Sequence, residues 1–364
     1  MSTKAVDSNN EIDILLVGAG VMSATLAAML KELDSNLRIA LVERLPNIAG
    51  ESSDGWNNAG TGHAGYCELN YTPQDAKGSI NIQRALSINA AFEVSLQFWS
   101  YLVENNILKA DDFIRATPHL SFVWGKDNVE FLKKRQTALS QHPLFEDMQF
   151  SEDATTLTQW MPLIMENRNT NEAAAATKVD YGTDVDFGAL TRQLVTHLNT
   201  QQNFDLLLNH NVTRLKQDKR SIWHVGIRDK ISKKSRTIKA NFVFLGAGGA
   251  ALPLLQKSGI PEAKGYGGFP VSGMWLVCKN QEVIQKHHAK VYGKAALGAP
   301  PMSVPHLDTR IINGEPALLF GPFAGFTTKF LKRGSLLDLF KSLKPNNLKS
   351  MSWAGLRNMD LTAY

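Results

Sequence analysis

The segment from Ile12 to Glu43 constrains the fold of this chain more than any other. It begins with a short apolar run that ends in Gly18-Ala19-Gly20, continues with an alanine- and leucine-rich pattern of helical spacing, and closes with a second apolar run. A strand, a glycine-rich turn, a helix and a further strand form a βαβ unit. The segment therefore predicts a Rossmann-type domain that binds a dinucleotide.

Each residue of the turn has its own task in such a site. Gly18 permits the tight turn, and Gly20, beside Ala19, lets the backbone approach a pyrophosphate at the helix N-terminus, where unpaired N–H groups favour negative charge. Ser23 stands where a third glycine is usual, and a small residue still permits close packing of helix and strand. Glu43 follows Ser23 by 20 residues, so it can accept hydrogen bonds from ribose hydroxyls. We expect these residues to bind the cofactor; the alternative is a coincidental glycine-rich turn.

Residues 45–73 form a long segment that is rich in Gly, Asn and Ser and fits neither helix nor strand. A long irregular segment inside a compact domain is usually functional. Because it also holds large aromatic residues, which a flexible surface loop would not need, we interpret it as backbone wrapped against the cofactor. The expected contacts are Asn58, Gly60, Thr61 and Gly62.

A second glycine-rich turn follows the apolar run Phe242–Leu245, and its Gly246 and Gly248 are further candidates for cofactor contact. The sheet thus resumes long after its first strand. Nicotinamide-binding domains have strands in close succession, whereas a large insertion is typical of two-domain FAD enzymes. The sequence therefore predicts an α/β fold with a discontinuous FAD-binding Rossmann-type domain and a second, antiparallel-sheet substrate domain.

The expected boundaries follow this pattern. Residues 11–78 and 209–264 form the two parts of the FAD-binding domain, 79–208 form a mostly helical insertion, and 265–364 form the substrate domain, which we expect to be incomplete at its C-terminus. Residues 1–10 are polar and expected to be disordered. Helices are predicted over 79–108, over 127–141 with a capping-box start at Asp127, and over 187–200 with Asp186 as N-cap, and a hairpin is predicted over 222–238.

Cysteine content and hydropathy limit the class of protein. Only Cys67 and Cys278 are present, far apart and outside any Cys/His cluster, which indicates a reducing compartment and neither a disulfide framework nor a metal site. Apart from the glycine-interrupted run near the N-terminus, no stretch approaches the length of a membrane span.

The formal net charge of +5 arises from scattered basic clusters. They include Lys133–Arg135, Lys230–Arg236, Lys286–Lys290 and Lys329–Arg333. Most such clusters are solvated turns or helix faces, and the alternative is attraction to an anionic membrane surface. Nucleic acid is not expected as a partner, because no basic motif with interleaved aromatic residues occurs.

Five blocks of sequence carry a specific resemblance: ILLVGAGVMSATLAAML, WNNAGTGHAGYCELNYTP, FVFLGAGG, SVPHLDTR and LLFGPFAGFTTKFL. With them the chain resembles the malate:quinone oxidoreductase family from about Glu11 onward. The resemblance implies an FAD-dependent enzyme that oxidises (S)-malate to oxaloacetate and passes two electrons to a membrane quinone. It also implies a cytoplasmic location, peripheral on the inner face of the cell membrane.

Two other interpretations stay open. The first is an FAD-dependent dehydrogenase or oxidase of another 2-hydroxy dicarboxylate, such as 2-hydroxyglutarate. The second is a non-catalytic flavin-binding fragment, because members of the family continue past Tyr364 with another glycine-rich segment near the flavin. If the sequence is complete, we expect slow flavin reduction and an exposed apolar surface that promotes aggregation.

Oxidation of a 2-hydroxy acid requires a hydride acceptor, a base and cations for the carboxylates. FAD would accept the hydride, and histidine is the natural base because its pKa lies near neutrality. Of nine histidines, His63 and His306 lie in the blocks above, and the block that contains His306 makes it the preferred base. Asp308 shares the strand face of His306 and could orient an imidazole nearby. Arg310, on that face again, can bind a carboxylate through two hydrogen bonds. Lys329 is a weaker candidate for the second carboxylate.

Overall fold

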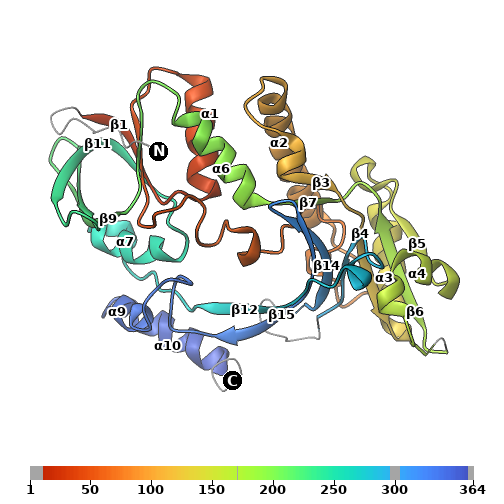
Figure 1. The fold of residues 1–364 in the computed structure, drawn as a ribbon. Helices are drawn as coiled ribbons and strands as arrows, with labels where there is room; N and C mark the ends of the chain where they lie inside the picture. Colours follow the sequence, from red (N-terminus) through yellow and green to blue (C-terminus); the bar gives the residue numbers. More distant parts are fainter. Residues whose placement is uncertain (1–10, 170, 296–303, 360–364) are drawn as a thin grey trace. The chain divides into compact units, whose positions relative to one another are not determined.

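A computed structural model describes residues 11–169, 171–295 and 304–359, and the statements below concern these residues. The disorder expected for residues 1–10 and the chain end at Tyr364 lie outside them. The chain forms two compact units (Figure 1), each of which is described by itself. Unit 1 comprises residues 1–58, 187–271 and 326–364, and unit 2 comprises residues 59–186 and 272–325.

Unit 1 is built on a six-stranded sheet with the strand order β8-β2-β1-β11-β10-β9. The first four strands run parallel, and the last three form an antiparallel meander. Apolar side chains of β1 and β2 pack with those of the meander in one core. The bounds are β1 Ile12–Val17, β2 Ile39–Val42, β8 Phe204–Leu207, β9 His210–Gln217, β10 Trp223–Asp229 and β11 Ser235–Leu245.

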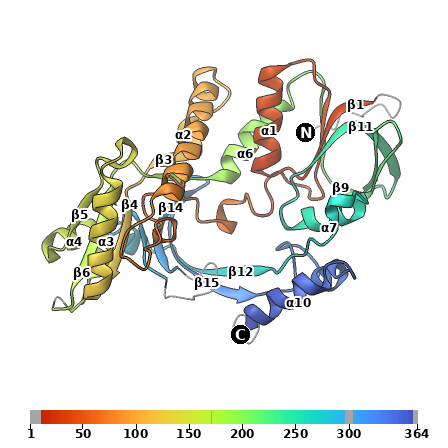
Figure 2. The ribbon, with the colours of Figure 1, turned by 180° about the vertical axis from the view of Figure 1, so that it is seen from behind.

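Helices α1 (Val21–Leu33) and α6 (Phe187–Leu198) lie side by side in unit 1, as both views show (Figures 1 and 2). The buried residues of α1 are mostly alanines, which let the helix lie close to the sheet. Helix α1 follows β1 directly, so the predicted βαβ unit is present. The remaining helices of this unit are α7 Ala251–Ser258, α9 Asp338–Ser342 and α10 Leu348–Arg357.

Unit 2 holds a seven-stranded sheet in the order β12-β15-β14-β13-β4-β6-β5. Strands β13 and β4 run parallel, whereas β14–β15, β13–β14, β4–β6 and β5–β6 are antiparallel pairs. Strands β3 and β7 form a separate antiparallel pair. The strands are β3 Ile114–Ala116, β4 His119–Trp124, β5 Gln149–Ser151, β6 Ala174–Val179, β7 Thr183–Val185, β12 Val271–Cys278, β13 Lys290–Tyr292, β14 His306–Ile312 and β15 Glu315–Phe326.

The helices of unit 2 are α2 Gln83–Glu104, α3 Lys126–Leu139, α4 Ala154–Trp160, α5 Pro162–Met165 and α8 Gln281–Ile284. Together the two units confirm the predicted fold class: an α/β Rossmann-type domain assembled from separate chain segments, and a second domain with a largely antiparallel sheet. None of the helices in the described residues is both long and apolar enough to cross a membrane.

The predicted helices are present with shifted ends. The capping box at Asp127 is wrong, because α3 begins one residue earlier, after Gly125, which has a φ of 84° and supplies no side-chain cap. Asp186 precedes α6, and its Oδ2 accepts a hydrogen bond from the backbone N–H of Asn313 (2.9 Å). Segment 45–73 holds only two single-turn 3₁₀ helices, in agreement with its irregular composition.

The division of the chain differs from the predicted boundaries. Strand β8 pairs in parallel with β2, so the sheet of unit 1 resumes directly after α6 and the units divide between residues 186 and 187, not at 208. The segment 79–208 also holds strands β3 to β8 besides its helices. Residues 326–364 group with unit 1, although the prediction assigned them to the substrate domain. A buried strand as short as β8 has too few residues to show a period.

Gly18 is fixed by the approach of two chain segments. Its φ is +98°, and a Cβ there would lie 2.6 Å from the carbonyl oxygen of Gly246. We predict that Gly18→Ala lowers the free energy of unfolding by at least about 2 kcal/mol. The matched control is Gly259→Ala, with a φ of +73° and no atom within 4 Å of the added Cβ, which should cost about 1 kcal/mol. Denaturant unfolding measures both, and equal losses would contradict the role of the backbone contact.

Candidate functional site

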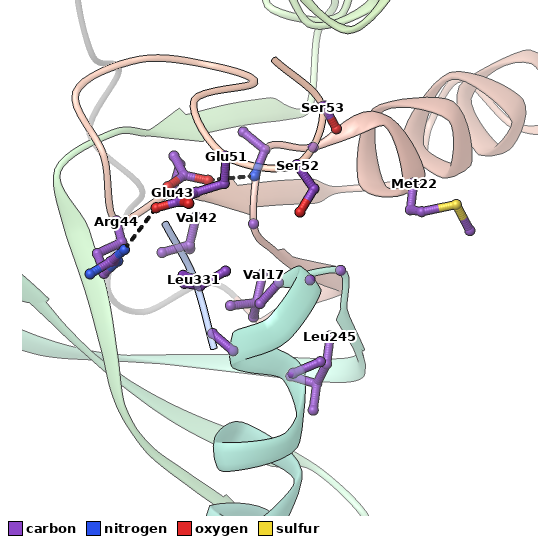
Figure 3. A pocket seen from close by; sticks show the side chains of 18 of the residues that line it. Val17, Met22, Val42, Glu43, Arg44, Glu51, Ser52, Ser53, Leu245 and Leu331 are labelled. Carbon is purple, nitrogen blue, oxygen red and sulfur yellow. Dashed lines mark hydrogen bonds and ion pairs between the residues drawn. The ribbon is translucent and has the colours of Figure 1, made fainter. Parts of the chain in front are cut away.

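The turn between β1 and α1 opens onto a pocket of about 630 Å³ in unit 1 (Figure 3). This volume is in the usual range for small-molecule and cofactor sites. The structure brings together seven of the predicted cofactor-binding residues at its wall. They are Gly18, Ala19, Gly20, Glu43, Asn58, Gly246 and Gly248.

Backbone donors are available at the N-terminus of α1. Gly20 is the N-cap and supplies no side-chain hydrogen bond, so the first N–H groups of the helix depend on other partners. The N–H of Val21 donates to Ser53 Oγ (2.9 Å). A Cβ on Gly20 would meet only this same oxygen, at 3.2 Å. Glycine therefore leaves the helix end open to an anionic group, which the N-terminal N–H groups favour.

Glu43 is held at the pocket wall by two backbone groups. Its Oε2 accepts the N–H of Ala19 (2.7 Å), and its Oε1 accepts the N–H of Leu45 (2.8 Å). An ionised carboxylate has about four acceptor sites, so both oxygens can still accept hydrogen bonds from ribose hydroxyls. Figure 3 shows Arg44 and Glu51 beside it, joined by an ion pair of 3.3 Å.

Four predicted cofactor contacts lie elsewhere. Ser23 is fully buried, and a Cβ on Gly246 would collide with its Oγ, so Ser23 serves the close packing of helix and strand. Gly60, Thr61 and Gly62 belong to unit 2, where Thr61 Oγ1 lies 2.8 Å from the hydroxyl of Tyr292. Their contact with a cofactor stays a prediction.

Unit 2 buries a row of polar side chains along β14. His306, Asp308 and Arg310 alternate with more exposed residues, so all three point to the same buried face. His306 Nδ1–H donates to Asp308 Oδ2 (2.6 Å), a contact that the shared strand face at i, i+2 permits. A carboxylate that holds the Nδ1 proton leaves Nε2 as the atom that can accept a proton.

Neighbouring residues determine the ionisation of Asp308 and the orientation of the His306 ring. Burial raises the pKa of Asp308, but His306, Lys290 and Arg310 lower it more, so the pKa of this carboxyl lies below its ordinary value and it is ionised at neutral pH. Tyr292, opposite His306 on β13, stacks on the imidazole with ring centroids 3.9 Å apart and planes at 16°. Trp275 contacts the imidazole edge to face, at 4.8 Å.

Arg310 is fully buried in an ion cluster. Its Nε lies 2.7 Å from Asp184 Oδ1, and Lys290 Nζ lies 2.9 Å from the same oxygen. The guanidinium packs on Gly60, where a Cβ would collide with it. These contacts give Arg310 a structural task, and the alternation along β14 explains why its side chain turns inward. Its role as a ligand of the substrate carboxylate stays a prediction.

The other two candidates differ from His306 in their surroundings. The ring of His63 lies 6.0 Å from that of Tyr71 and 6.4 Å from that of Tyr292, and burial lowers the pKa of His63 to about 4, which makes it a weak base. Lys329 belongs to unit 1, where it lines a second cavity of about 580 Å³ together with aromatic residues.

Sequence reasoning does not identify Asp184, Lys290 or Tyr292. Lys290 ends a basic cluster that resembles a solvated turn, yet it is fully buried. Arg135 of another cluster is also fully buried, where it donates to Thr72 Oγ1 and to two backbone carbonyls. Strand β13 is buried at all three of its residues, so no alternation in the sequence marks Lys290 or Tyr292 as part of a site.

Comparison with known proteins gives a consistent result. The family model described as malate:quinone oxidoreductase matches residues 10–364. A "Probable malate:quinone oxidoreductase" of Methylobacillus flagellatus is 66% identical over 358 residues, which cover 98% of this chain and 72% of the relative. One of Hahella chejuensis is 64% identical, over 97% of this chain and 71% of the relative. The chain belongs to the malate:quinone oxidoreductase family.

Solved structures show the same fold at low identity. The L-α-glycerophosphate oxidase of Mycoplasma pneumoniae with FAD bound aligns with a TM-score of 0.64 and 17% identity, over 93% of this chain and 81% of that one. The glycine oxidase of Geobacillus kaustophilus aligns with a TM-score of 0.61 and 14% identity, over 87% and 72%. The malate:quinone oxidoreductase family is one of FAD-dependent oxidoreductases, as predicted.

The pocket of unit 1 fits such a dinucleotide. Gly20 leaves room where a side chain would stand between the backbone and a pyrophosphate, and the helix N-terminus favours its charge. The carboxylate of Glu43 meets the requirement for a ribose acceptor. The pocket therefore meets the requirements that the adenosine and pyrophosphate of FAD would place on a binding site.

We predict that Gly20→Val weakens flavin binding at least about tenfold, because the side chain would occupy the space of the pyrophosphate. The backbone at Gly20 is extended (φ −92°, ψ 176°) and accepts any residue, and of the surrounding atoms only Ser53 Oγ, 3.2 Å from the added Cβ, has to move. Flavin content per protein measures the effect, circular dichroism controls for folding, and Gly20→Ala should give an intermediate loss. Full flavin content in the folded valine variant would contradict this geometry.

We predict that unit 2 loses stability in acid through two neutral histidines. Burial lowers the pKa of His119 to about 3 and that of His63 to about 4, from an ordinary 6.5. Below pH 6.5 the unfolded chain binds protons that the folded chain excludes. Stability is therefore complete above that pH and falls by about 1.4 kcal/mol per pH unit for each histidine until its folded pKa is reached.

Denaturant unfolding at a series of pH values measures this slope. His119→Gln should reduce it, because a glutamine side chain at this buried position takes up no proton. The exposed His288 provides the matched control His288→Gln. A slope that is unchanged in His119→Gln would contradict the assignment.

Proposed function

We propose that the chain binds FAD in the pocket of unit 1, oxidises (S)-malate to oxaloacetate, and passes the two electrons to a quinone dissolved in the membrane. Membership of the malate:quinone oxidoreductase family supports the substrate and the acceptor. Within the molecule, the observation that carries the proposal is the buried His306, whose Nδ1 proton is held by an ionised Asp308. The proposed location is cytoplasmic, on the inner face of the cell membrane.

The geometry of unit 2 supplies the proton chemistry of this reaction. His306 Nε2 takes the proton of the malate hydroxyl, and the negative charge of Asp308 stabilises the imidazolium that results. The ring stack with Tyr292 keeps the imidazole from rotating away. When bound, FAD supplies the hydride acceptor that no amino-acid side chain offers. As the hydroxyl proton and the hydride leave, the C–O bond becomes the carbonyl of oxaloacetate.

The carboxylates of malate require cations. Arg310 and Lys329 remain the proposed ligands. The guanidinium of Arg310 is paired with Asp184 and its Nη2 donates to the carbonyl of Val185 (3.3 Å), so a malate carboxylate bound there would share the guanidinium with these partners. Asn58, in the wall of the unit 1 pocket, and Gly60, Thr61 and Gly62, in unit 2, remain proposed cofactor contacts.

We predict that His306→Ala lowers the rate of flavin reduction by malate by about 10²–10⁴-fold, the usual contribution of a general base, with flavin content unchanged. Asp308→Asn should also be slow, because the amide carries no charge to stabilise the imidazolium. Anaerobic bleaching of the flavin by malate measures both. His288→Ala, at an exposed histidine, is the matched control and should keep its rate.

Three outcomes would contradict the proposal. Near-normal bleaching in His306→Ala would move the base to another residue. Bleaching by 2-hydroxyglutarate but not by malate would identify a different dicarboxylate as substrate. A preparation without flavin would remove the cofactor assignment itself.

A further inference from the structure

One segment of unit 1, residues 329–359, concentrates the positive charge of the chain. It contains α9 and α10, and we call it the α9–α10 surface (Figure 1). Seven basic residues and one acidic residue lie in it, whereas the whole chain has a formal net charge of only +5. Six of the basic residues are exposed, and the seventh, Lys329, lines the second cavity. The exposed six are Lys332, Arg333, Lys341, Lys344, Lys349 and Arg357.

The same surface exposes large apolar side chains. Those at least 50% exposed are Leu336, Leu337, Phe340, Leu348, Trp353, Leu356 and Met359. On α10 the apolar Leu348, Trp353 and Leu356 share the exposed side of the helix with Lys349 and Arg357. The guanidinium of Arg357 lies 3.9 Å from the centre of the Trp353 ring.

The opposite side of the segment is anchored to unit 1. Asn347 Nδ2 donates to the carbonyl of Tyr266 (2.9 Å), and Ser350 Oγ donates to that of Gly265 (3.2 Å). Gln256 of α7 donates to the carbonyl of Ser342 (2.8 Å). The apolar side chains are therefore held on a fixed support and face away from it.

The charge of the surface is not neutralised within the described residues. Its one acidic side chain, Asp338, accepts the backbone N–H groups of Ser335 (2.9 Å) and Phe330 (3.3 Å). The ion pairs found in the described part of the chain involve none of the seven basic side chains.

We infer that the α9–α10 surface binds an anionic lipid bilayer. A helix that presents leucine, tryptophan and basic residues on one side lies in the interface of a membrane, with the apolar groups among the acyl chains and the cations at the headgroups. The inference rests on the proposed function, in which a lipid-dissolved acceptor requires the enzyme to reach the bilayer.

Charge complementarity favours a bilayer over a second copy of the chain. A second copy of the chain on the same surface would place like charges opposite each other, which costs affinity. Two of the other basic clusters lose a cation to the interior, because Arg135 and Lys290 are fully buried. In the cluster Lys230–Arg236 only Ile231 offers a large exposed apolar side chain. The α9–α10 surface thus combines both features in the described residues.

Vesicle sedimentation tests the inference with the full chain. We expect binding to vesicles of phosphatidylcholine with phosphatidylglycerol, and little binding to phosphatidylcholine alone. The triple variant Lys341→Glu, Lys344→Glu, Lys349→Glu should bind the anionic vesicles at least about 100-fold more weakly, since each cation near such a surface contributes about fivefold. The double variant Trp353→Ser, Leu356→Ser loses two exposed apolar side chains. It should therefore lose the part of the vesicle binding that persists at high salt.

The matched control is Lys216→Glu, Lys219→Glu, Lys239→Glu, which makes the same change of charge at exposed lysines of the meander β9–β11. It should keep most of the binding. An equal loss in both triple variants would overturn the inference in favour of diffuse charge. Absence of vesicle binding would overturn it as well. So would a dimer of the chain that the double variant Trp353→Ser, Leu356→Ser abolishes, because the surface would then bind a second copy. Loss of vesicle binding when the chain is extended by the family's C-terminal part would also overturn it, because it would show that this part covers the surface.

Anaerobic bleaching by malate in solution, measured on the same variants, separates this inference from the proposed function. Bleaching without vesicle binding overturns the membrane surface alone. Vesicle binding without bleaching overturns the proposed reaction and leaves the surface in place.

Discussion

The pairing of Asp184 with two buried cations is the interaction on which unit 2 depends. Lys290 and Arg310 are fully buried, and both lie within 3 Å of one carboxylate oxygen, while the other oxygen accepts the N–H of Ile311 (2.9 Å). Removing one partner of such a cluster leaves an uncompensated buried charge, which typically costs about 3–5 kcal/mol. Because Lys290 is also opposite Asp308 across the β13–β14 pair, the cluster and the His–Asp pair share one electrostatic balance.

That balance explains why the candidate base can be buried at all. The two cations face two carboxylates, Asp184 and Asp308, so the interior of unit 2 carries little net charge around His306. His63 and His119 have no such carboxylate bonded to them, and burial keeps them neutral. His306 and His119 are both buried, and they differ in chemistry because His306 bonds to a carboxylate whereas His119 contacts the backbone of Thr183.

The sequence predicts what is local. The turn at Gly18, the helix that follows, and the shared face of His306 and Asp308 all result from periods of two or 3.6 residues and from backbone sterics, so they can be identified before any tertiary contact is known. The second glycine-rich turn, after the apolar run Phe242–Leu245, adds the discontinuous domain.

What could not be predicted depends on distant pairing. Strand β8 is too short to show a period, and the burial of Lys290 and Arg135 is set by partners far away in the chain, Asp184 and the carbonyls of Gly65 and Tyr66. Sequence spacing placed Arg310 on the correct face of β14. It did not show that Asp184 pairs with Arg310 there and that the side chain is fully buried. The distinction between a ligand of substrate and a structural cation is thus a tertiary property.

The order of strands in unit 1 also sets the course of folding. Strand β1 lies between β2 and β11, and Ile12 pairs with Ala240. At a synthesis rate of about 5–20 residues per second, β11 is made on the order of 10–50 s after β1. Throughout this time the apolar edge of β1 has no partner on one side. Non-local pairing of this kind is intrinsically slow and exposed to aggregation, so nascent chains of this protein are expected to depend on chaperones until residue 245 has emerged.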